Sequence, residues 1–593
     1  MLSTFDRGGL VSSLLHRAAQ ACVLTVRRRG CWLPAIVHHH PHNMERILSL
    51  CVFLSLLLST LSLNVDLKIE SDIVAAQTDT VVACFTLDYW PPSKCDYGAC
   101  QWGLNSLFNI NLENENLRAA VAAFKGKVHL RLGGSLEDFV LYDVPGSPRP
   151  ESCIKFEDFG TPTNATKLGY EIFSGCLNSE RWDQLHTFCA DLGCKLIFGI
   201  NGLFGRNLPG PCSPDVNCRV LPTPACCTNW SGAWNPSNAE ALLRYSASKN
   251  QTLYAVELGN ELVGSKGIES HVSVDDYLAD WKVFMRLLDD VYGSNRPLTV
   301  VPDTSWESDW YADFLVRLHA ANPELSPDVV THHLYSMGAG VNPLAWQAAL
   351  NATIMDEVLS LGKQVRSVVK AASPRSRVWV GEAGGFYNSG ADNVTNAFNS
   401  GFWFLDQLGV FALTGHGSYC RQTLAGGFYS LLDSLTLKPN PDYYNLLAFS
   451  QLMGSKVLQV TRAQESIESS SVLRAYAHCM HPDAHSFQNG GVTVLLINLH
   501  NATSVHVASM DDGTQKNMLA LDLREEYVFT SACKDADERQ LLACRHLLLN
   551  GKLLESPTIS PVIVHGGLKS PLIVGPLSYS FVAFPQAQAT ACM

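Results

Sequence analysis

Short apolar runs alternate with segments of helical periodicity between residues 81 and 454. We expect eight of the runs to be strands, at residues 81–87, 127–132, 195–201, 253–258, 298–301, 329–333, 378–381 and 410–413. Helical periods lie between them, for example at 277–291 and 354–369. Eight strand–helix units in succession predict an α/β fold, a (β/α)₈ TIM barrel over residues 81–454.

The pattern changes after Gly454 to short β-rich runs separated by turns rich in Gly, Pro, Ser and Asn. The runs lie at 457–460, 473–477, 492–498, 527–530, 562–565 and 578–584. They predict a C-terminal antiparallel β-sandwich over residues 455–593. Residues 66–80 precede the barrel, and we expect them to join that sandwich as an edge strand.

Two segments fall outside this scheme. Residues 205–230 form an irregular Cys- and Pro-rich insertion after the third strand, which is either a disulfide-stapled lid or retained intronic sequence. Residues 47–63 are an apolar run that follows Met44, so residues 44–65 read as a secretory signal peptide, with an uncleaved anchor as the alternative. The Arg-rich residues 1–43 are interpreted as an over-extended gene model ahead of a true start at Met44, or as a targeting segment.

Composition supports a secreted protein. The chain has 593 residues and a net charge of −12 without a long basic run, which argues against nucleic acid as a partner. Of its 19 cysteines, 16 follow the signal segment, and disulfides indicate an oxidising compartment. Six Asn-x-Ser/Thr glycosylation sequons occur, at Asn164, Asn229, Asn250, Asn351, Asn393 and Asn501.

These features predict an extracellular, cell-wall location, with a vacuolar or lysosome-like compartment or peripheral membrane association as alternatives.

Cys95/Cys100 and Cys189/Cys194 are close pairs suited to disulfides. A second cluster contains Cys212, Cys218, Cys226 and Cys227; a zinc site is the alternative there, although the cluster lacks two CxxC elements.

Two carboxylates end apolar strands of the predicted barrel. Glu261 follows Asn260 after the fourth strand, and Glu382 ends the seventh. The carboxyl ends of barrel strands meet at one mouth, and two carboxylates about 5–5.5 Å apart are the requirement for cleaving a glycosidic bond with retention. We assign Glu261 as acid/base and Glu382 as nucleophile, and expect no metal and no cofactor. The alternative is a helix-start carboxylate and a surface carboxylate.

Other side chains at this mouth fit a sugar pocket. Tyr335 can donate to Glu382, and His333 can line the pocket, although a core role is the alternative for both. The Gly-rich loop at 384–390 can present backbone N–H groups to an anion such as a sugar carboxylate; a tight packing turn is the alternative.

The motifs together resemble the heparanase-like retaining β-glucuronidases, especially their plant members. The resemblance rests on residues 86–98 (TLDYWPPSKCDYG), 131–135 (RLGGS), 257–262 (ELGNEL), 381–382 (GE) and 419–422 (YCRQ), and it runs from about residue 72 to 585. It implies a barrel with a β-sandwich and hydrolysis of β-linked glucuronic acid with retention. By motif match, Asn260 and Glu261 fall on the acid/base pair and Glu382 on the nucleophile.

The same resemblance implies further substrate-binding residues. Asp88 falls on a sugar-hydroxyl contact, and His333 and Tyr335 on pocket residues of the sixth strand. Asn388 and Ser389 fall on the loop whose backbone binds the uronate carboxylate, and Tyr429 falls on a tyrosine that also binds this carboxylate. Phe428 and the insertion at 205–230 depart from the family pattern.

Residues 302–312 (PDTSWESDWYA) lack the basic residues that animal heparanases use on sulfated chains. The expected substrates are therefore glucuronic-acid-containing cell-wall glycans, such as arabinogalactan, or glucuronide conjugates. Two other hypotheses stay open: a catalytically inactive carbohydrate-binding protein on this scaffold, and a glycosidase for a neutral pentoside.

Overall fold

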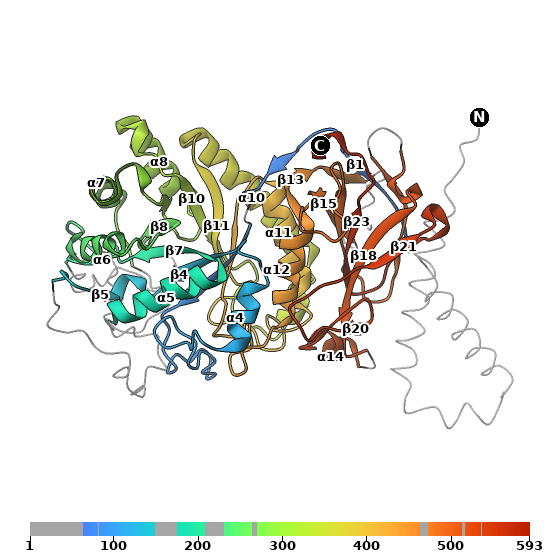
Figure 1. The fold of residues 1–593 in the computed structure, drawn as a ribbon, viewed down its shortest axis with the longest axis horizontal. Helices are drawn as coiled ribbons and strands as arrows, with labels where there is room; N and C mark the ends of the chain where they lie inside the picture. The colour runs from blue at the N-terminus through green and yellow to red at the C-terminus, as the bar shows by residue number, and fades with distance from the viewer. Residues whose placement is uncertain are drawn as a thin grey trace, which may run out of the picture.

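The computed structural model describes residues 63–80, 82–148, 175–207, 230–263, 270–462, 473–512, 516–534 and 536–593. Two halves lie side by side in Figure 1, with the barrel on the left and a β-sheet structure on the right. Helices α11 (Ser400–Leu413) and α12 (Pro441–Leu452) lie between them. The predicted signal segment overlaps the described chain at residues 63–65, which form the start of strand β1 (Leu63–Ile69).

The left half is a closed barrel of parallel strands, which confirms the predicted TIM barrel. Around the ring the order is β3-β4-β7-β8-β9-β10-β11-β12, with β12 pairing back to β3. The strands are Ala83–Asp88 (β3), His129–Gly133 (β4), Lys195–Ile200 (β7), Ala255–Leu258 (β8), Leu298–Val301 (β9), Val329–Leu334 (β10), Arg377–Ala383 (β11) and Tyr419–Arg421 (β12). A short two-stranded sheet, β5 (Leu141–Asp143) with β6 (Cys176–Asn178), lies outside the ring.

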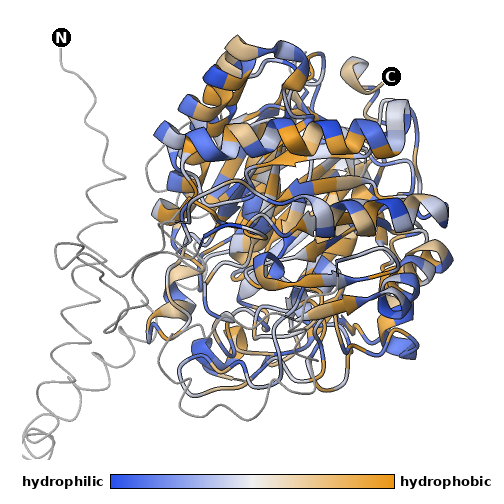
Figure 2. Cartoon of the chain, turned by 90° about the vertical axis from the view of Figure 1, so that its left-hand side faces the viewer, coloured by the Kyte–Doolittle hydropathy of each residue, from blue (hydrophilic) through white to orange (hydrophobic). Residues whose placement is uncertain are grey.

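Amphipathic helices cover the barrel. They are Glu115–Ala122 (α4), Ser179–Leu192 (α5), Ser237–Ser248 (α6), Val274–Tyr292 (α7), Ser308–Ala321 (α8), Ala345–Ala348 (α9) and Ala352–Ala372 (α10). Side-chain N-caps begin several of them: Asn178 accepts from the N–H of Arg181, and Ser273 from that of Asp276. Figure 2 shows blue and orange alternating along these helices, while the strands inside are mostly orange.

The eighth predicted strand is wrong. Residues 410–413 are the last turn of α11, and the barrel closes instead with the three-residue strand β12. Helix α11 is buried on all sides between the barrel and the second half, so it has no polar stripe. A short apolar window of such a helix cannot be told from a buried strand by periodicity.

The right half consists of two packed sheets. The larger has the order β2-β13-β15-β16-β23-β18-β19-β20, with β21 also paired to β18, and the smaller has the order β14-β1-β17-β22. Their strands are Ala76–Gln77 (β2), Met453–Leu458 (β13), Val460–Arg462 (β14), Leu473–Met480 (β15), Val492–Asn498 (β16), Val505–Asp511 (β17), Leu523–Ser531 (β18), Leu547–Leu549 (β19), Lys552–Leu553 (β20), Val562–His565 (β21), Leu572–Val574 (β22) and Ser578–Phe584 (β23); a short helix, α14, covers Glu538–Leu542.

Strand β1 joins this sandwich from the other end of the chain, and Figure 1 shows it in blue among red strands. It lies inside the smaller sheet, between β14 and β17, rather than at the edge. One face of the larger sheet packs on the smaller one through residues such as Val494 and Val582. The other face packs on the barrel helices through residues such as Tyr579, whose ring stacks on Phe398.

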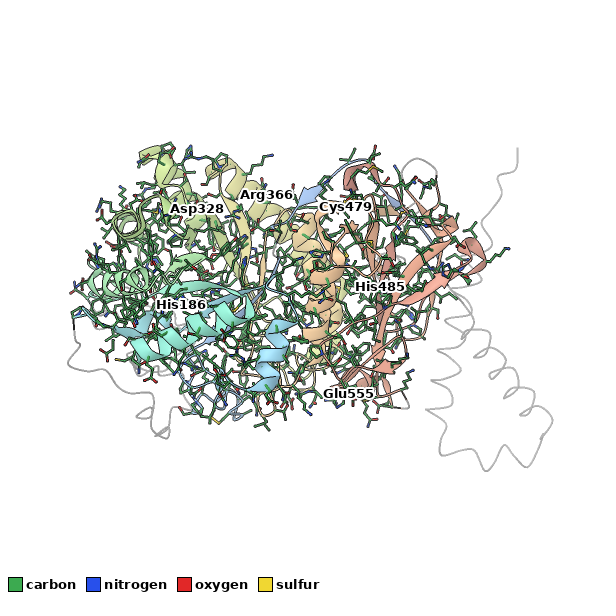
Figure 3. The ribbon with its side chains drawn as sticks, viewed as in Figure 1. His186, Asp328, Arg366, Cys479, His485 and Glu555 are labelled. Carbon is green, nitrogen blue, oxygen red and sulfur yellow. A yellow bond between two sulfur atoms is a disulfide. The ribbon has the colours of Figure 1, made fainter. Side chains whose placement is uncertain are left out.

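Disulfides link distant parts of the described chain. Cys84–Cys420 joins β3 to β12, the two strands that close the barrel. Cys479, labelled in the right half of Figure 3, bonds to Cys592 near the C-terminus. Cys533 bonds to Cys544, and the two predicted close pairs, Cys95–Cys100 and Cys189–Cys194, are both disulfides.

Residues 208–229 of the predicted insertion at 205–230, its cysteine cluster and the sequons Asn164 and Asn229 lie outside the described residues. The asparagines of the other four sequons are exposed. No described helix is long and apolar enough to cross a membrane.

Candidate active site

The barrel interior changes from apolar to polar along the strands. Toward the amino ends it is filled by a buried cluster that includes Cys84, Ala255 and Trp379. Side chains two residues apart on a strand point to the same face. Two residues after Cys84, β3 carries the buried Thr86, and two residues after Ala255, β8 carries the buried Glu257. The polar layer is therefore at the carboxyl end, where the predicted catalytic residues lie.

Arg131 of β4 is at the centre of this polar layer and is 0% exposed. Its Nε donates to Glu257 at 2.9 Å, and its Nη1 donates to Glu382 Oε2 at 2.9 Å. Its Nη2 donates to Asn260 Oδ1 at 2.9 Å and to Asp303. One guanidinium thus fixes groups from the carboxyl ends of β8, β9 and β11.

Glu382 lies at the end of β11, and both of its carboxylate oxygens accept hydrogen bonds. Its second oxygen, Oε1, accepts a hydrogen bond of 2.5 Å from the hydroxyl of Tyr335. The register between β10 and β11 shifts after His332, so that Glu382 stands opposite His333. This irregularity turns the Glu382 side chain into the mouth.

Glu261 follows β8 and is held from two sides. Its backbone has a φ of 56°, and its N–H donates to the carbonyl of Asp303 at 2.9 Å. Its Oε1 lies 2.9 Å from Nδ1 of His333, and Nε2 of the same ring lies 3.0 Å from Asp303 Oδ1. A continuous chain of contacts therefore runs from Glu261 through His333, Asp303 and Arg131 to Glu382.

The two glutamates also act on the same neighbours. Burial raises the pKa of Tyr335, and the charges of Glu382 and Glu261 raise it further. Burial opposes the charged form of His333, but Asp303 and Glu382 together raise its pKa well above the ordinary value. The raised pKa favours the imidazolium form of His333, in which Nδ1–H donates to Glu261 and Nε2–H donates to Asp303.

The carboxylates beneath the mouth differ in protonation. Burial would raise the pKa of Asp303, but Arg131 and His333 outweigh it and lower that pKa. Burial, followed by the charge of Asp303, raises the pKa of Glu257 to about 8. Burial also raises the pKa of Asp138 to about 7, although its carboxylate accepts the N–H groups of Asn260 and Gly202. Burial thus favours the protonated form of Glu257 and Asp138, whereas Arg131 and His333 favour the ionised form of Asp303.

Asp88, at the end of β3, faces the same pocket and is 2% exposed. Burial and the charge of Glu382 raise its pKa to about 7. It accepts a hydrogen bond of 2.8 Å from Gln422 Nε2, which lies 3.4 Å from the hydroxyl of Tyr429. Gly134, with a φ of +93°, packs so closely that a Cβ there would lie 2.7 Å from Asp88 Oδ2.

The loop after Glu382 offers unused backbone donors. Asn388, Ser389 and Gly390 all have positive φ, at 56°, 67° and 79°. Among the described residues, the backbone N–H groups of these three have no acceptor. The loop packs on Tyr429, because the N–H of Phe428 donates to the carbonyl of Ser389 at 2.6 Å. A run of N–H groups without acceptors in a loop that packs on the Tyr429 segment suits an anion.

All the predicted catalytic and substrate-binding residues thus lie at one end of the barrel. The sequence motifs gave no role to Arg131, Asp303 and Gln422, although Arg131 and Gln422 lie in motifs that carry the family resemblance. The available signal was a charged or amide residue inside or directly after an apolar strand. The described residues contain no group of His, Cys, Asp and Glu arranged to hold a metal ion.

Comparison of the fold with solved structures supports the architecture. A GH51 arabinofuranosidase from Xanthomonas axonopodis aligns with a TM-score of 0.56 at 14% identity, over 88% of this chain and 99% of that one. A 4-O-α-L-rhamnosyl-β-D-glucuronidase from Fusarium oxysporum aligns with a TM-score of 0.55 at 14% identity, over 88% of this chain and 100% of that one. At such low identity these likenesses show the fold alone.

Sequence comparison is more specific. Heparanase-like protein 3 of Arabidopsis thaliana is 34% identical over 92% of this chain and 98% of its own length. Baicalin-β-D-glucuronidase of Scutellaria baicalensis is 35% identical over 87% of this chain and 92% of its own length. The profile described as "Glycosyl hydrolase family 79, N-terminal domain" matches residues 64–409. The chain is therefore a member of glycoside hydrolase family 79, an enzyme of the heparanase and β-glucuronidase type.

Proposed function

We propose that the protein is a secreted, retaining β-glucuronidase that removes β-linked glucuronic acid from cell-wall glycans or glucuronide conjugates. The chain of contacts from Glu261 to Glu382 supports this proposal, because it links two carboxylates at one end of the barrel that have different partners. His333 and Tyr335 hold their side chains. Such a pair performs double displacement without a metal.

In the first step the Glu261 carboxyl group gives its proton to the glycosidic oxygen while the Glu382 carboxylate attacks the anomeric carbon. The bond to the leaving group breaks, and a glucuronyl ester of Glu382 forms. In the second step Glu261 takes a proton from water, the water oxygen attacks the anomeric carbon, and the ester bond to Glu382 breaks. Two inversions leave the product with the β configuration.

Neighbouring residues support these two steps. Arg131 and Tyr335 both donate to Glu382, so its carboxylate is held in one orientation for attack. Arg131 occupies the Asn260 carbonyl oxygen, which leaves the Asn260 amide N–H₂ for a sugar hydroxyl. Asp88, at the end of β3, accepts from Gln422 and can contact a second hydroxyl.

The uronate carboxylate would bind the free N–H groups of residues 388–390 and the hydroxyl of Tyr429. A neutral sugar would leave those donors unpaired, so the pocket should discriminate against it.

The loop after β9 favours an unsulfated leaving group. Val263, which follows Glu261 by two residues, lines a cavity of about 290 Å³ together with Glu307, Ser308, Asp309 and Trp310. Carboxylates on this side would repel the sulfate groups of heparan sulfate. This supports conjugates or plant glycans as substrates.

The enzymatic proposal is tested by hydrolysis of 4-nitrophenyl β-D-glucuronide, β-D-glucoside and α-L-arabinofuranoside. We expect turnover of the glucuronide, and a loss of about 10³-fold or more in Glu382→Gln. Binding of glucuronides without any turnover would favour an inactive carbohydrate-binding protein, and preferential cleavage of the arabinofuranoside a pentosidase.

Secretion is supported by the disulfides and by the four exposed sequons. Expression from Met44 in a eukaryotic host tests it: the protein should reach the medium and lose mass on treatment with a peptide N-glycosidase. Retention in the cytosol without glycans would contradict it.

A further inference from the structure

A small disulfide-closed turn lies beside the loop that we expect to bind the uronate. Cys95 and Cys100 are bonded to each other, and between them Asp96 and Ala99 exchange backbone hydrogen bonds of 3.0 and 2.9 Å. The two central residues, Tyr97 and Gly98, have φ values of 53° and 84°. This is a two-residue hairpin turn of the type that needs positive φ at both central positions, and the disulfide closes it covalently.

The turn contacts the first two residues of the free N–H run. The hydroxyl of Tyr97 accepts a hydrogen bond of 3.1 Å from Asn388 Nδ2. The hydroxyl of Ser389 donates to Asp96 Oδ2, and it accepts a bond of 2.9 Å from Nε1 of Trp102. Both hydrogen-bonding roles of the Ser389 hydroxyl are therefore filled by this segment.

The same segment also holds Tyr429. Trp102 is 0% exposed, and its ring meets that of Tyr429 edge-on, with centroids 6.2 Å apart. The next residue back, Gln101, accepts the N–H of Gly427 at 3.1 Å. Residues 95–102 thus contact three of the four residues that the proposed function assigns to the uronate: Asn388, Ser389 and Tyr429.

The charge of Asp96 is compensated locally. Lys94 Nζ lies 2.8 Å from Asp96 Oδ1, and it also lies over the ring of Trp90 at 4.5 Å. Asp96 can therefore anchor Ser389 without presenting an unbalanced negative charge to a bound carboxylate.

We propose that the disulfide-closed turn Cys95–Cys100, together with Trp102, is a positioning element that sets the selectivity of this enzyme for glucuronate over neutral sugars. The turn touches no reacting atom. It acts by fixing residues 388–390 and Tyr429 before the substrate binds. Because these donors are already ordered, less conformational entropy is lost when the substrate binds. The inference rests on the proposed glucuronidase function.

Tyr97→Phe is the mildest test. Tyr97 is 51% exposed, so the variant keeps its ring on the surface and loses only the acceptor for Asn388. We expect KM for 4-nitrophenyl β-D-glucuronide to rise about five-fold, as for one lost hydrogen bond. The kcat should change much less, and cleavage of the matching glucoside should not change.

Cys95→Ser/Cys100→Ser tests the whole turn. We expect its glucuronide-to-glucoside ratio of kcat/KM to fall roughly ten-fold or more, because several contacts loosen together. The matched control is Cys189→Ser/Cys194→Ser, which removes a disulfide of the same spacing between α5 and β7, at the other end of the barrel. The control should keep the ratio even where its Tm falls.

The outcomes separate the two proposals. A wild-type enzyme that cleaves no glucuronide overturns the proposed function, and the inference with it. A wild-type enzyme that prefers glucuronides, with an unchanged KM and ratio in Tyr97→Phe and in the folded Cys95→Ser/Cys100→Ser variant, overturns the inference alone. Where the double variant does not fold, Tyr97→Phe decides.

Discussion

Replacing Arg131 by methionine removes the cation at the centre of the polar layer. The guanidinium is completely buried and donates hydrogen bonds to Glu257, Asp303 and Glu382. In the Arg131→Met variant these three carboxylates would share one pocket with His333 as the remaining cation in contact with them among the described residues.

Removing one partner of a buried ion pair costs about 3–5 kcal/mol. A folded domain is stable by only about 5–15 kcal/mol, so the loss would be a large fraction of the total. At pH 8 we expect Tm to fall by roughly 5–10 °C. We also expect kcat to collapse, because Glu382 loses the donor that orients it.

The loss should depend on pH in one direction. The pKa of Glu257 is already raised to about 8 in the folded protein. A carboxyl group whose pKa is higher in the folded than in the unfolded state stabilises the protein at low pH. This contribution is lost as the pH rises from the unfolded pKa to the folded pKa. Without Arg131 the pKa of Glu257 rises further, and the pKa of Asp303 rises from its lowered value. Glu257 is protonated more fully at pH 5 than at pH 8, so the loss of stability relative to the wild type should be smaller at pH 5 than at pH 8.

The assay is thermal unfolding followed by circular dichroism at pH 5 and pH 8, for the wild type and Arg131→Met. Arg118→Met is the matched control, because Arg118 makes its ion pairs with Glu113 and Asp191 at the surface and should leave Tm nearly unchanged. A variant as stable as the wild type at pH 8, or one that loses more at pH 5, would refute the idea that Arg131 holds ionised carboxylates together.

Three further predictions concern single parts of the structure. Glu261→Gln should slow hydrolysis of alkyl glucuronides by about 10²–10⁴-fold but should spare the formation of the glycosyl-enzyme from 4-nitrophenyl glucuronide, since nitrophenolate leaves without a proton; equal losses in pre-steady-state kinetics would argue against an acid role. Tyr335→Phe removes the 2.5 Å hydrogen bond to Glu382 and should lower kcat roughly ten-fold or more, whereas an unaltered kcat in steady-state assays would be inconsistent with orientation by this hydroxyl. Cys84→Ala/Cys420→Ala opens the covalent link between β3 and β12 and should cost about 2–4 kcal/mol, seen as a lower Tm with KM unaffected; an unshifted Tm would contradict a stabilising role.

The barrel could largely be predicted from the sequence because its parallel strands are buried on both faces. Such strands read as continuous apolar runs ended by polar residues, and both Glu261 and Glu382 were found at such ends. The eighth strand could not be found, because β12 has only three residues and the fully buried α11 gives a stronger apolar signal.

The contacts inside the polar layer could not be predicted in the same way. Arg131 meets Asp303 only because barrel closure brings β4 and β9 to face a common interior, and no local pattern encodes this. The position of β1 was missed for a similar reason: its parallel partner β17 lies more than 400 residues away along the chain, as in the pair Leu63 and Val505.

The most direct test of the two-carboxylate mechanism is the configuration of the first product. Proton NMR during cleavage of 4-nitrophenyl β-D-glucuronide should show the β anomer of glucuronic acid first, with the α anomer growing in only by mutarotation. Initial release of the α anomer would mean that water attacks directly, and would contradict the assignment of Glu382 as the nucleophile.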